Sequence, residues 1–325
     1  MTNIWQELPK PFFVLAPMEE VTDTVFRQVV ARAGAPDLFF TEFTWVDGLM
    51  TRARASVSRR FIHTPAEQPL IAQIWGTEPR AFFTAARQLA SGEFGPFAGI
   101  DLNMGCPERK IVKRGACAGL IDHQDRALAI IEPTKEGAGT LPVSVKTRCG
   151  TTSWVTEEWA ELLLRQDLAA LTIHGRIASE RSDFPARWEE IAKVAALRDR
   201  LGVPTLIIGN GDVTSYRDGL DKAARAGVDG VMVGRGIFRN LWLFNPDIDP
   251  AAIPLRDRLA FLAGHLELWR ETWVDGKYFG ALKKLYKTYL AGIPGTEPLH
   301  RELLHLQTVD ATLERIRAEI AAVAA

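Results

Sequence analysis

Cys106 is the cysteine of this chain whose surroundings favour chemistry. It follows the small-residue turn Asn103-Met104-Gly105 and precedes Pro107, at the end of a short apolar run that predicts a strand. An unperturbed thiol has a pKa of about 8.5, so it is mostly protonated at neutral pH and can act as a general acid, or as a nucleophile after activation. Cys117 and Cys149 lack this placement, and we interpret them as packing residues.

A lysine and a histidine also directly follow apolar runs. Lys146 comes after Val143-Ser144-Val145, where a buried ammonium is costly unless it meets an anion or its pKa is lowered. Two chemical roles fit this lysine: it can hold the anionic part of a cofactor, or it can form a Schiff base as in aldolases. A structural, ion-paired lysine is the remaining interpretation. For His174, a structural role is at least as common as a catalytic one.

Glycines stand at the ends of two further apolar runs, in Asn210-Gly211-Asp212 and in Gly234-Arg235-Gly236. The main-chain N–H groups of such turns can approach a phosphate closely, and Arg235 adds a positive charge. In barrels of alternating strands and helices, phosphate sites commonly lie after the seventh and eighth strands. The paired placement therefore favours phosphate binding over ordinary turn chemistry.

Eight short apolar runs, each followed by a turn signal and then by helical periodicity, must position these residues. The runs are residues 13–16, 38–41, 70–75, 99–102, 142–146, 170–173, 205–208 and 230–233. Amphipathic segments at 22–33, 79–91, 157–165 and 215–226 predict helices that cover one face of a sheet. This alternation predicts an α/β fold, a parallel (β/α)8 TIM barrel, in which catalytic residues lie where the strands end.

The polar, proline-rich stretch at residues 246–254 ends the alternation and predicts a domain boundary. We expect a catalytic barrel domain at 1–245 and an all-α helical domain at 255–325.

Of the 325 residues, 47% are hydrophobic, and no apolar run approaches the roughly 20 residues that span a bilayer. With an odd number of cysteines and no signal peptide, the sequence predicts a cytoplasmic protein. We expect a monomer with no membrane contact and no metal site.

Positive charge is concentrated locally although the net charge is −1, from 39 Lys and Arg against 40 Asp and Glu. The basic clusters are Arg52, Arg54, Arg59 and Arg60; Arg109, Lys110, Lys113 and Arg114; and Lys277, Lys283, Lys284 and Lys287. The last segment also contains Tyr278, Tyr286 and Tyr289, and basic residues mixed with aromatic ones suit RNA phosphates and unstacked bases. The three clusters together favour RNA as a partner, held by local patches and not by a global field.

The motifs at the predicted strand ends, taken together, resemble the tRNA-dihydrouridine synthase family. They are Ala16-Pro17-Met18-Glu19-Glu20-Val21-Thr22-Asp23, Asp101-Leu102-Asn103-Met104-Gly105-Cys106-Pro107, Val145-Lys146-Thr147-Arg148, Thr172-Ile173-His174-Gly175-Arg176, Asn210-Gly211-Asp212 and Gly234-Arg235-Gly236. They span the whole predicted barrel in order. Tyr278-Phe279-Gly280 and Gly292-Ile293-Pro294-Gly295 are similar to the helical RNA-binding domain of that family.

The resemblance implies an FMN-binding barrel that uses NADPH to reduce the C5–C6 bond of a uridine in tRNA. It implies FMN contacts from Pro17, Met18 and Glu19 beside the ring, from Gln73, Lys146 and His174 around the isoalloxazine, and from Asn210, Gly211, Asp212, Gly234 and Arg235 near the ribityl phosphate. Lysine at 146 would stabilise negative charge on reduced flavin. Hydride would go to uracil C6, and the thiol of Cys106 would protonate C5 from the opposite face of an extruded base.

For the tRNA we expect contacts from both parts of the chain. The residues are Asn103, Arg109, Lys110, Lys113, Arg114, Arg176, Lys277, Tyr278, Lys283, Lys284 and Lys287. Glu19 after Pro-Met is similar to the subgroup that modifies U16 of tRNA, whereas U17, U20 and U20a are the other known targets of the family.

Two segments depart from the family pattern. Cys117 and Ala118 stand where the family usually has Gly followed by a small residue, and 177–180 reads Ile-Ala-Ser-Glu in place of Thr-Arg-x-Gln. The alternative functions are an FMN-dependent reductase or dehydrogenase of a free pyrimidine, similar to dihydroorotate dehydrogenase, and a Schiff-base lyase that uses Lys146. The first leaves the helical tail without a role.

Overall fold

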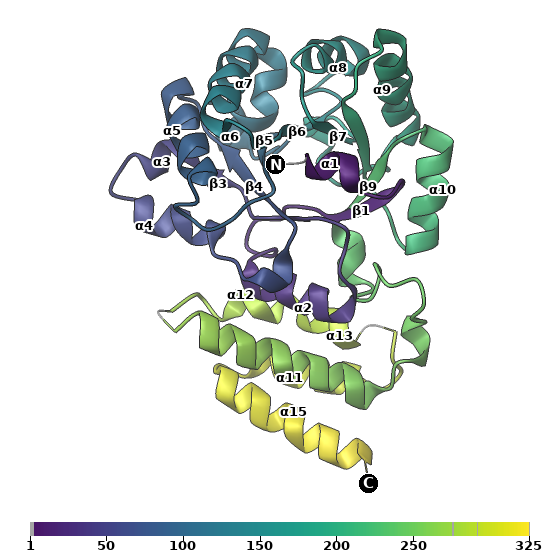
Figure 1. The fold of residues 1–325 in the computed structure, drawn as a ribbon. Coiled ribbons are helices and arrows are strands. Elements are labelled where there is room, and N and C mark those ends of the chain that lie inside the picture. Colours follow the sequence, from purple (N-terminus) through teal and green to yellow (C-terminus); the bar gives the residue numbers. More distant parts are fainter. Residues whose placement is uncertain (1–2, 275, 291, 325) are drawn as a thin grey trace. The chain divides into compact units, whose positions relative to one another are not determined.

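A parallel sheet forms the centre of the larger part of the chain (Figure 1). This computed structural model describes residues 3–274, 276–290 and 292–324. The strands are β1 (Phe12–Leu15), β2 (Phe39–Phe40), β3 (Thr44–Trp45), β4 (Leu70–Trp75), β5 (Gly99–Met104), β6 (Val143–Arg148), β7 (Ala170–His174), β8 (Leu206–Asn210) and β9 (Gly230–Val233). Neighbours along the sheet follow the order β1-β9-β8-β7-β6-β5-β4-β2, and the short β3 pairs with β4 after β2.

The sheet closes into a barrel because β1 is paired on both edges. On one edge it runs parallel to β9, with Phe12 opposite Gly230. On the other edge Val14 bridges to Leu38, directly before β2, and the amide of Leu15 donates to the carbonyl of Leu38 at 3.3 Å. The predicted (β/α)8 barrel is therefore confirmed. Its strands are buried on both faces, which is why they appear in the sequence as continuous apolar runs.

Helices follow the strands and surround the sheet in Figure 1. The longer ones in this part are α5 (Pro79–Ala90), α7 (Gln124–Ala138), α8 (Thr156–Leu164), α9 (Trp188–Leu201) and α10 (Tyr216–Ala226). In α5, Pro79 occupies the first turn, where it costs no hydrogen bond, and the buried residues recur with helical spacing from Ala81 to Leu89. Gly202 ends α9 in the left-handed conformation, the usual way to stop a helix.

The amino-terminal end of the barrel is closed by an aromatic side chain. Trp5, on the short helix α1 (Ile4–Glu7), is 1% exposed and lies 6.0 Å from the ring of Phe12 and 6.3 Å from that of Phe40. Val14, Ile208 and other inward-facing strand residues complete this core. With that end filled, the carboxyl ends of the strands are the end at which a site can form.

The described chain forms two compact units. One contains residues 1–24, 36–213 and 217–234, and the other contains 25–35, 214–216 and 235–325. The second unit includes most of α2 (Thr24–Gly34) and the helices α11 (Leu255–Thr272), α12 (Gly280–Lys283), α13 (Tyr286–Leu290), α14 (Glu297–His305) and α15 (Val309–Ala324). Helix α11 packs against α13 and α15, so the predicted helical tail is confirmed. In the predicted boundary stretch, Pro250–Ala252 forms a single turn of 3-10 helix.

Candidate active site

Strand register brings the predicted site residues together at the carboxyl end of the barrel. Asn103 of β5 lies opposite Lys146 of β6, Arg148 of β6 lies opposite His174 of β7, and His174 lies opposite Asn210 of β8. In the parallel sheet these side chains belong to strand ends that meet at one mouth. Residues that are far apart in the sequence thus become neighbours through pairing alone.

A chain of buried polar side chains lies beneath this mouth. The hydroxyl of Ser144 donates to Oδ1 of Asp101 at 2.6 Å, and Nε2 of Gln73 donates to Oδ2 at 2.7 Å. Nδ2 of Asn103 then donates to Oε1 of Gln73 at 3.0 Å. Burial raises the pKa of Asp101 to about 6, although both hydrogen bonds favour its carboxylate. These hydrogen bonds fix the orientation of the side-chain amides of Gln73 and Asn103, because each has a defined donor and acceptor.

Asn103, at the end of this hydrogen-bonded series, also fixes the turn that carries Cys106. Oδ1 of Asn103 accepts the main-chain N–H of Gly105 at 3.1 Å and that of Cys106 at 3.0 Å. On the other side of the turn, Nε of Arg148 donates to the carbonyl of Gly105 at 2.8 Å. The position of the Cys106 main chain therefore depends on side chains from two strands.

The thiol of Cys106 is half-buried, and its pKa is lower than that of an ordinary cysteine. A hydrogen bond from the side chain of Cys117 is the main reason that its pKa falls from 9.0 to about 7. A backbone hydrogen bond at Glu108 and the charge of Arg148 lower the pKa further, against the effect of burial. Cys117 itself is fully buried, and burial together with Cys106 raises its pKa well above the ordinary value. At neutral pH, Cys106 is thus populated both as thiol and as thiolate.

Lys146 is a cation without a carboxylate partner among the described ion pairs. Its ammonium donates to Oδ1 of Asn210 at 3.2 Å, and Nδ2 of Asn210 donates to the carbonyl of Met232 at 2.8 Å. Burial lowers the pKa of Lys146 to about 8, and repulsion from Arg148 acts in the same direction. A half-buried cation held only by an amide is suited to an anionic ligand.

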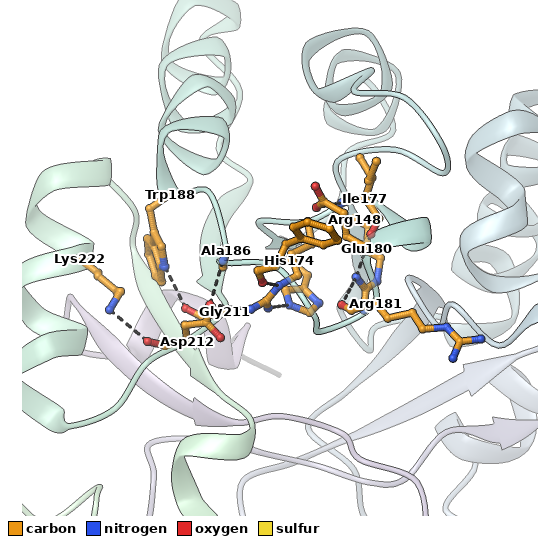
Figure 2. Close-up of polar contacts among 12 residues, drawn as sticks. Arg148, His174, Ile177, Glu180, Arg181, Ala186, Trp188, Gly211, Asp212 and Lys222 are labelled. Atoms are coloured by element: carbon orange, nitrogen blue, oxygen red, sulfur yellow. Dashed lines mark hydrogen bonds and ion pairs between the residues drawn. The ribbon is translucent and has the colours of Figure 1, made fainter.

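His174 and Asp212 both contact the guanidinium of Arg176. Figure 2 shows His174, Asp212 and Ala186 in this region. Nη1 of Arg176 lies 2.8 Å from Nε2 of His174, and Nη2 donates to Oδ2 of Asp212 at 2.5 Å. Because a guanidinium can only donate, Nε2 accepts, and the imidazole is neutral with its proton on Nδ1. Oδ2 of Asp212 also accepts the amide of Ala186 at 2.8 Å. The cluster sets the tautomer of His174.

The predicted glycine turns occupy two different environments. At Gly211, where φ is +134°, an added Cβ would lie 2.4 Å from Cβ of Ala186, and Nε1 of Trp188 donates to its carbonyl at 2.9 Å. Packing alone therefore requires glycine there. At Gly234 an added Cβ would meet only Cβ of Ala16, at 3.8 Å, and the sulfur of Met18, at 4.0 Å. The space beside Gly234 is thus open within its unit.

The Pro17-Met18-Glu19 segment follows β1 and is partly exposed. The amide of Met18 donates to Oγ1 of Thr22 at 2.8 Å, which forms a tight turn after the strand. Glu19 forms an ion pair with Arg60, whose Nε lies 3.1 Å from Oε1. Arg60, a member of the first basic cluster, is therefore engaged by a carboxylate.

The basic residues assigned to tRNA differ in exposure within each unit. In the barrel unit, Arg109, Lys110, Lys113 and Arg114 are exposed on and after α6 (Arg109–Val112), whereas Arg176 is 2% exposed. In the helical unit, Lys284 and Lys287 are exposed, Lys277 and Lys283 are half-buried, and Tyr278 is 80% exposed.

Two of the three tyrosines interpreted as RNA-contacting are not available for stacking. Tyr286 and Tyr289 are both 0% exposed, so that interpretation is wrong for them. The hydroxyl of Tyr289 lies 2.6 Å from Nδ1 of the buried His265, and burial raises the pKa of both tyrosines. They form the core of the helical unit because α13 packs against α11.

Arg148, Asp101 and Cys117 also belong to the site, although the sequence does not single them out as functional. For Arg148 a signal exists in the sequence: positions 146 and 148 alternate along a strand, so the two side chains share one face. Asp101 stands two residues before Asn103 and shares its face for the same reason.

Among the described residues no group of His, Cys, Asp and Glu is placed to hold a metal ion. Within those same ranges no helix is both long and apolar enough to cross a bilayer.

The family profile and the curated relatives agree with one another. The sequence profile of the family described as Dihydrouridine synthase (Dus) matches residues 14–325. A Staphylococcus aureus (strain MRSA252) protein named "Probable tRNA-dihydrouridine synthase" is 43% identical over 312 residues, which cover 94% of this chain and 92% of that protein. A Bacillus subtilis (strain 168) protein named "Probable tRNA-dihydrouridine synthase 2" is 42% identical over 315 residues, 95% of this chain and 94% of that protein. Among solved structures, morphinone reductase in complex with tetrahydroNAD aligns with a TM-score of 0.48 at 12% identity, over 71% of this chain and 85% of that chain.

Proposed function

The chain belongs to the dihydrouridine synthase (Dus) family, and we propose that it is an FMN-dependent tRNA-dihydrouridine synthase. The named relatives supply the reaction and the substrate class. The observation that carries the proposal is the juxtaposition of an acidic thiol, Cys106, with the cation Lys146 at the mouth of a barrel. A proton donor and an anion-stabilising group are the two protein functions that reduction of a uracil ring requires.

The residues of the mouth fit a bound FMN. Gly234 is not required by packing, and a glycine with open space beside it allows the main chain to approach a phosphate closely. Lys146 has no carboxylate partner among the described ion pairs, so it can meet the negative edge of an isoalloxazine ring. Arg235 is exposed directly after Gly234 and would add charge for a phosphate. Gln73, with both ends of its amide hydrogen-bonded to protein, would hold its orientation at the ring.

The chain's own residues then have distinct tasks. When bound, FMN reduced by NADPH would supply a hydride to C6 of the uracil. Cys106 holds the proton that goes to C5, and the hydrogen bonds from its turn to Asn103 keep that thiol in place. Lys146 stabilises negative charge, and Asn210 orients its ammonium. His174, neutral with its proton on Nδ1, provides a hydrogen-bond donor of fixed tautomer.

We propose that the tRNA is held by both units through phosphate contacts. The exposed basic residues of α6 directly follow the Cys106 turn in the sequence, so they would bind the backbone near the extruded uridine. In the helical domain at 255–325, the exposed Lys284 and Lys287 can bind phosphates. The exposed Tyr278, in the loop before α12, can stack on an unstacked base. Arg176, in contrast, has a structural role, because its guanidinium is buried on His174 and Asp212.

The lyase alternative is set aside because of the family match and not because of the lysine itself. A lysine whose pKa is lowered to about 8 by burial would also suit Schiff-base formation, since about a tenth of it is neutral at pH 7. The free-pyrimidine alternative shares the flavin site and is separated from the proposal only by substrate. The two therefore need a direct assay.

The test begins with the absorption spectrum of the purified protein and identification of the chromophore released by heat. The protein is then incubated with an unmodified tRNA transcript and NADPH, and dihydrouridine is measured by mass spectrometry of the nucleosides. We expect FMN near one equivalent, dihydrouridine in the tRNA, and none when Cys106→Ala is used in place of the wild type. Mapping the modified fragment tests U16 as the target. A colourless protein that takes up no FMN, or one that reduces a free pyrimidine and not tRNA, would overturn the proposal.

A further inference from the structure

Cys106 and Cys117 form a pair of thiols in direct contact. Their side chains are hydrogen-bonded to one another, and the amide of Ala118 donates to the carbonyl of Cys106 at 3.3 Å. The first contact joins the two sulfur-bearing groups, and the second joins the two main chains beside them. A disulfide requires both kinds of proximity, because its Cα and Cβ separations are narrowly limited.

The two thiols differ in access to solvent. Cys106 is half-buried at the mouth, whereas Cys117 begins the 3-10 helix η3 (Cys117–Asp122) and is 0% exposed. A small oxidant therefore reaches Cys106 first, and the buried thiol of Cys117 lies next to the oxidised sulfur. This arrangement of an accessible thiol next to a second one is typical of cysteines that are oxidised reversibly.

We propose that Cys106 and Cys117 form a reversible disulfide when the protein meets a hydroperoxide, with Cys106 as the oxidised thiol and Cys117 as the resolving one. In the first step the thiolate of Cys106 attacks one oxygen of hydrogen peroxide. The O–O bond breaks, the sulfur becomes a sulfenic acid, and the other oxygen leaves as water after it takes up a proton. In the second step the sulfur of Cys117 attacks the sulfenic sulfur, an S–S bond forms, and a second water leaves.

The electrons balance over the two steps. The two cysteines together lose two electrons and two protons, and the peroxide gains them as two molecules of water. A dithiol such as dithiothreitol reverses the reaction, since thiol–disulfide exchange returns both cysteines to thiols and oxidises the reductant.

The main chain between the two cysteines can adjust to the shorter S–S distance. The intervening residues 107–114, which include α6, are exposed or partly exposed, whereas the strand before Cys106 and the turn at Cys117 are buried. Cys117 has a φ of +50°, in the left-handed region that favours glycine. Closing the bond needs a small inward movement of the Cys106 turn, in which its hydrogen bonds with Asn103 and Arg148 lengthen while the buried strand stays in place.

Cys149 provides an internal control. It is 1% exposed, its thiol donates to the carbonyl of His174 at 3.5 Å, and burial raises its pKa to about 12. The structure gives it no contact with either of the other two cysteines. It should remain reduced under conditions that join Cys106 to Cys117.

The experiment uses hydrogen peroxide on the native protein, followed by alkylation of free thiols in denaturant and tryptic peptide mapping. Basic residues lie between the two cysteines, so trypsin releases Cys106 in peptide 88–109, Cys117 in peptide 115–126 and Cys149 in peptide 149–165. We expect peptides 88–109 and 115–126 to be joined, with the free thiols falling from three to one. Dithiothreitol should separate the two peptides and restore both thiols.

Two variants make the outcome specific. Cys149→Ala should give the same joined peptides. Cys117→Ser, which keeps a side chain of similar size, should give none, and its Cys106 should proceed to sulfinic acid that dithiothreitol does not reverse. The proposal is overturned if wild-type Cys106 reaches sulfinic acid while Cys117 stays free, or if the joined pair includes Cys149.

Loss of tRNA reduction in the oxidised protein, and its recovery with dithiothreitol, is a further expectation that rests on the proposed function. The peptide map does not depend on that function. An inactive protein that still forms the disulfide would refute the synthase activity and leave the redox pair intact.

Discussion

The hydrogen bond from Cys117 predicts a defined pH profile for the reactivity of Cys106. With a pKa of about 7, half of the Cys106 side chains are thiolate at pH 7. Replacing Cys117 by Ala removes the largest influence that lowers this pKa, while burial, which raises it, remains. The pKa should therefore rise toward its ordinary value of 9.0, where only about one side chain in 100 is thiolate at pH 7.

The expected change in rate is smaller than the change in thiolate fraction. A thiolate becomes a better nucleophile as its pKa rises, with a Brønsted coefficient of about 0.4–0.5, so a shift of about two units increases intrinsic reactivity roughly six- to tenfold. The thiolate fraction falls about 50-fold at pH 7, and the net loss of rate there is about five- to eightfold. Above about pH 10 both proteins are fully ionised, and the variant should react faster than the wild type by that same six- to tenfold.

The assay is the rate of iodoacetamide modification of Cys106, followed by the mass of peptide 88–109 from pH 5 to pH 11. Cys117→Ser is the matched control, because its hydroxyl can still donate to a thiolate at Cys106 and should keep part of the shift. Two results would refute the reasoning: a wild-type midpoint near 9, or a Cys117→Ala midpoint that stays near 7. Under the proposed function, turnover should fall above pH 7 as the proton donor ionises, and this alkaline limit should move upward in Cys117→Ala.

Three further predictions concern stability and binding. Burial raises the folded-state pKa of Asp101 from 3.8 to about 6, so the free energy of unfolding should fall by about 3 kcal/mol as pH rises through that interval. Asp101→Asn should lack this loss, and urea titrations of both proteins across the interval measure the difference. Asp212→Ala leaves the buried guanidinium of Arg176 without its carboxylate, and because the Asp212 side chain is 36% exposed we expect a cost of roughly 2 kcal/mol in urea unfolding; a midpoint unchanged from wild type would contradict this. Lys283→Glu combined with Lys287→Glu should weaken tRNA binding and reduce the slope of log K against log salt by about 0.7–0.9 per lost phosphate contact, and an unchanged slope would show that neither lysine binds phosphate.

The barrel could be predicted from sequence because its strands carry their own signal. Strands buried on both faces, such as β4 at Leu70–Trp75, leave continuous apolar runs, and the eight runs correspond to the eight strands around the barrel. The family was also predictable, because its motifs cluster at strand ends, and the profile match over residues 14–325 confirms it. In both cases the signal is local in the sequence.

The polar connections of the site had no such signal. The hydrogen bonds from Gln73 to Asp101 and from Asn103 to Gln73 join residues about 30 positions apart on adjacent strands, and their existence depends on register. The sequence predicts a packing role for Cys117, because nothing in it indicates that the turn after α6 returns this residue to Cys106. For Tyr286 and Tyr289 the neighbouring lysines predict an exposed, RNA-binding surface. The prediction is wrong because the packing of α13 on α11 buries both tyrosines.

The charge of the mouth explains why a protein of net charge −1 is suited to anionic ligands. Arg176 is neutralised by Asp212, but Arg148 donates only to main-chain carbonyls, those of Gly105, Ile177 and Arg181. Burial and repulsion from Arg148 lower the pKa of Lys146 against the attraction of Asp101 and Cys106, so the fold holds the two cations together at a cost that a further anion would relieve. Because binding of an anion favours the protonated lysine, ligand affinity should fall as pH rises through about 8, the pKa of Lys146 in the ligand-free protein.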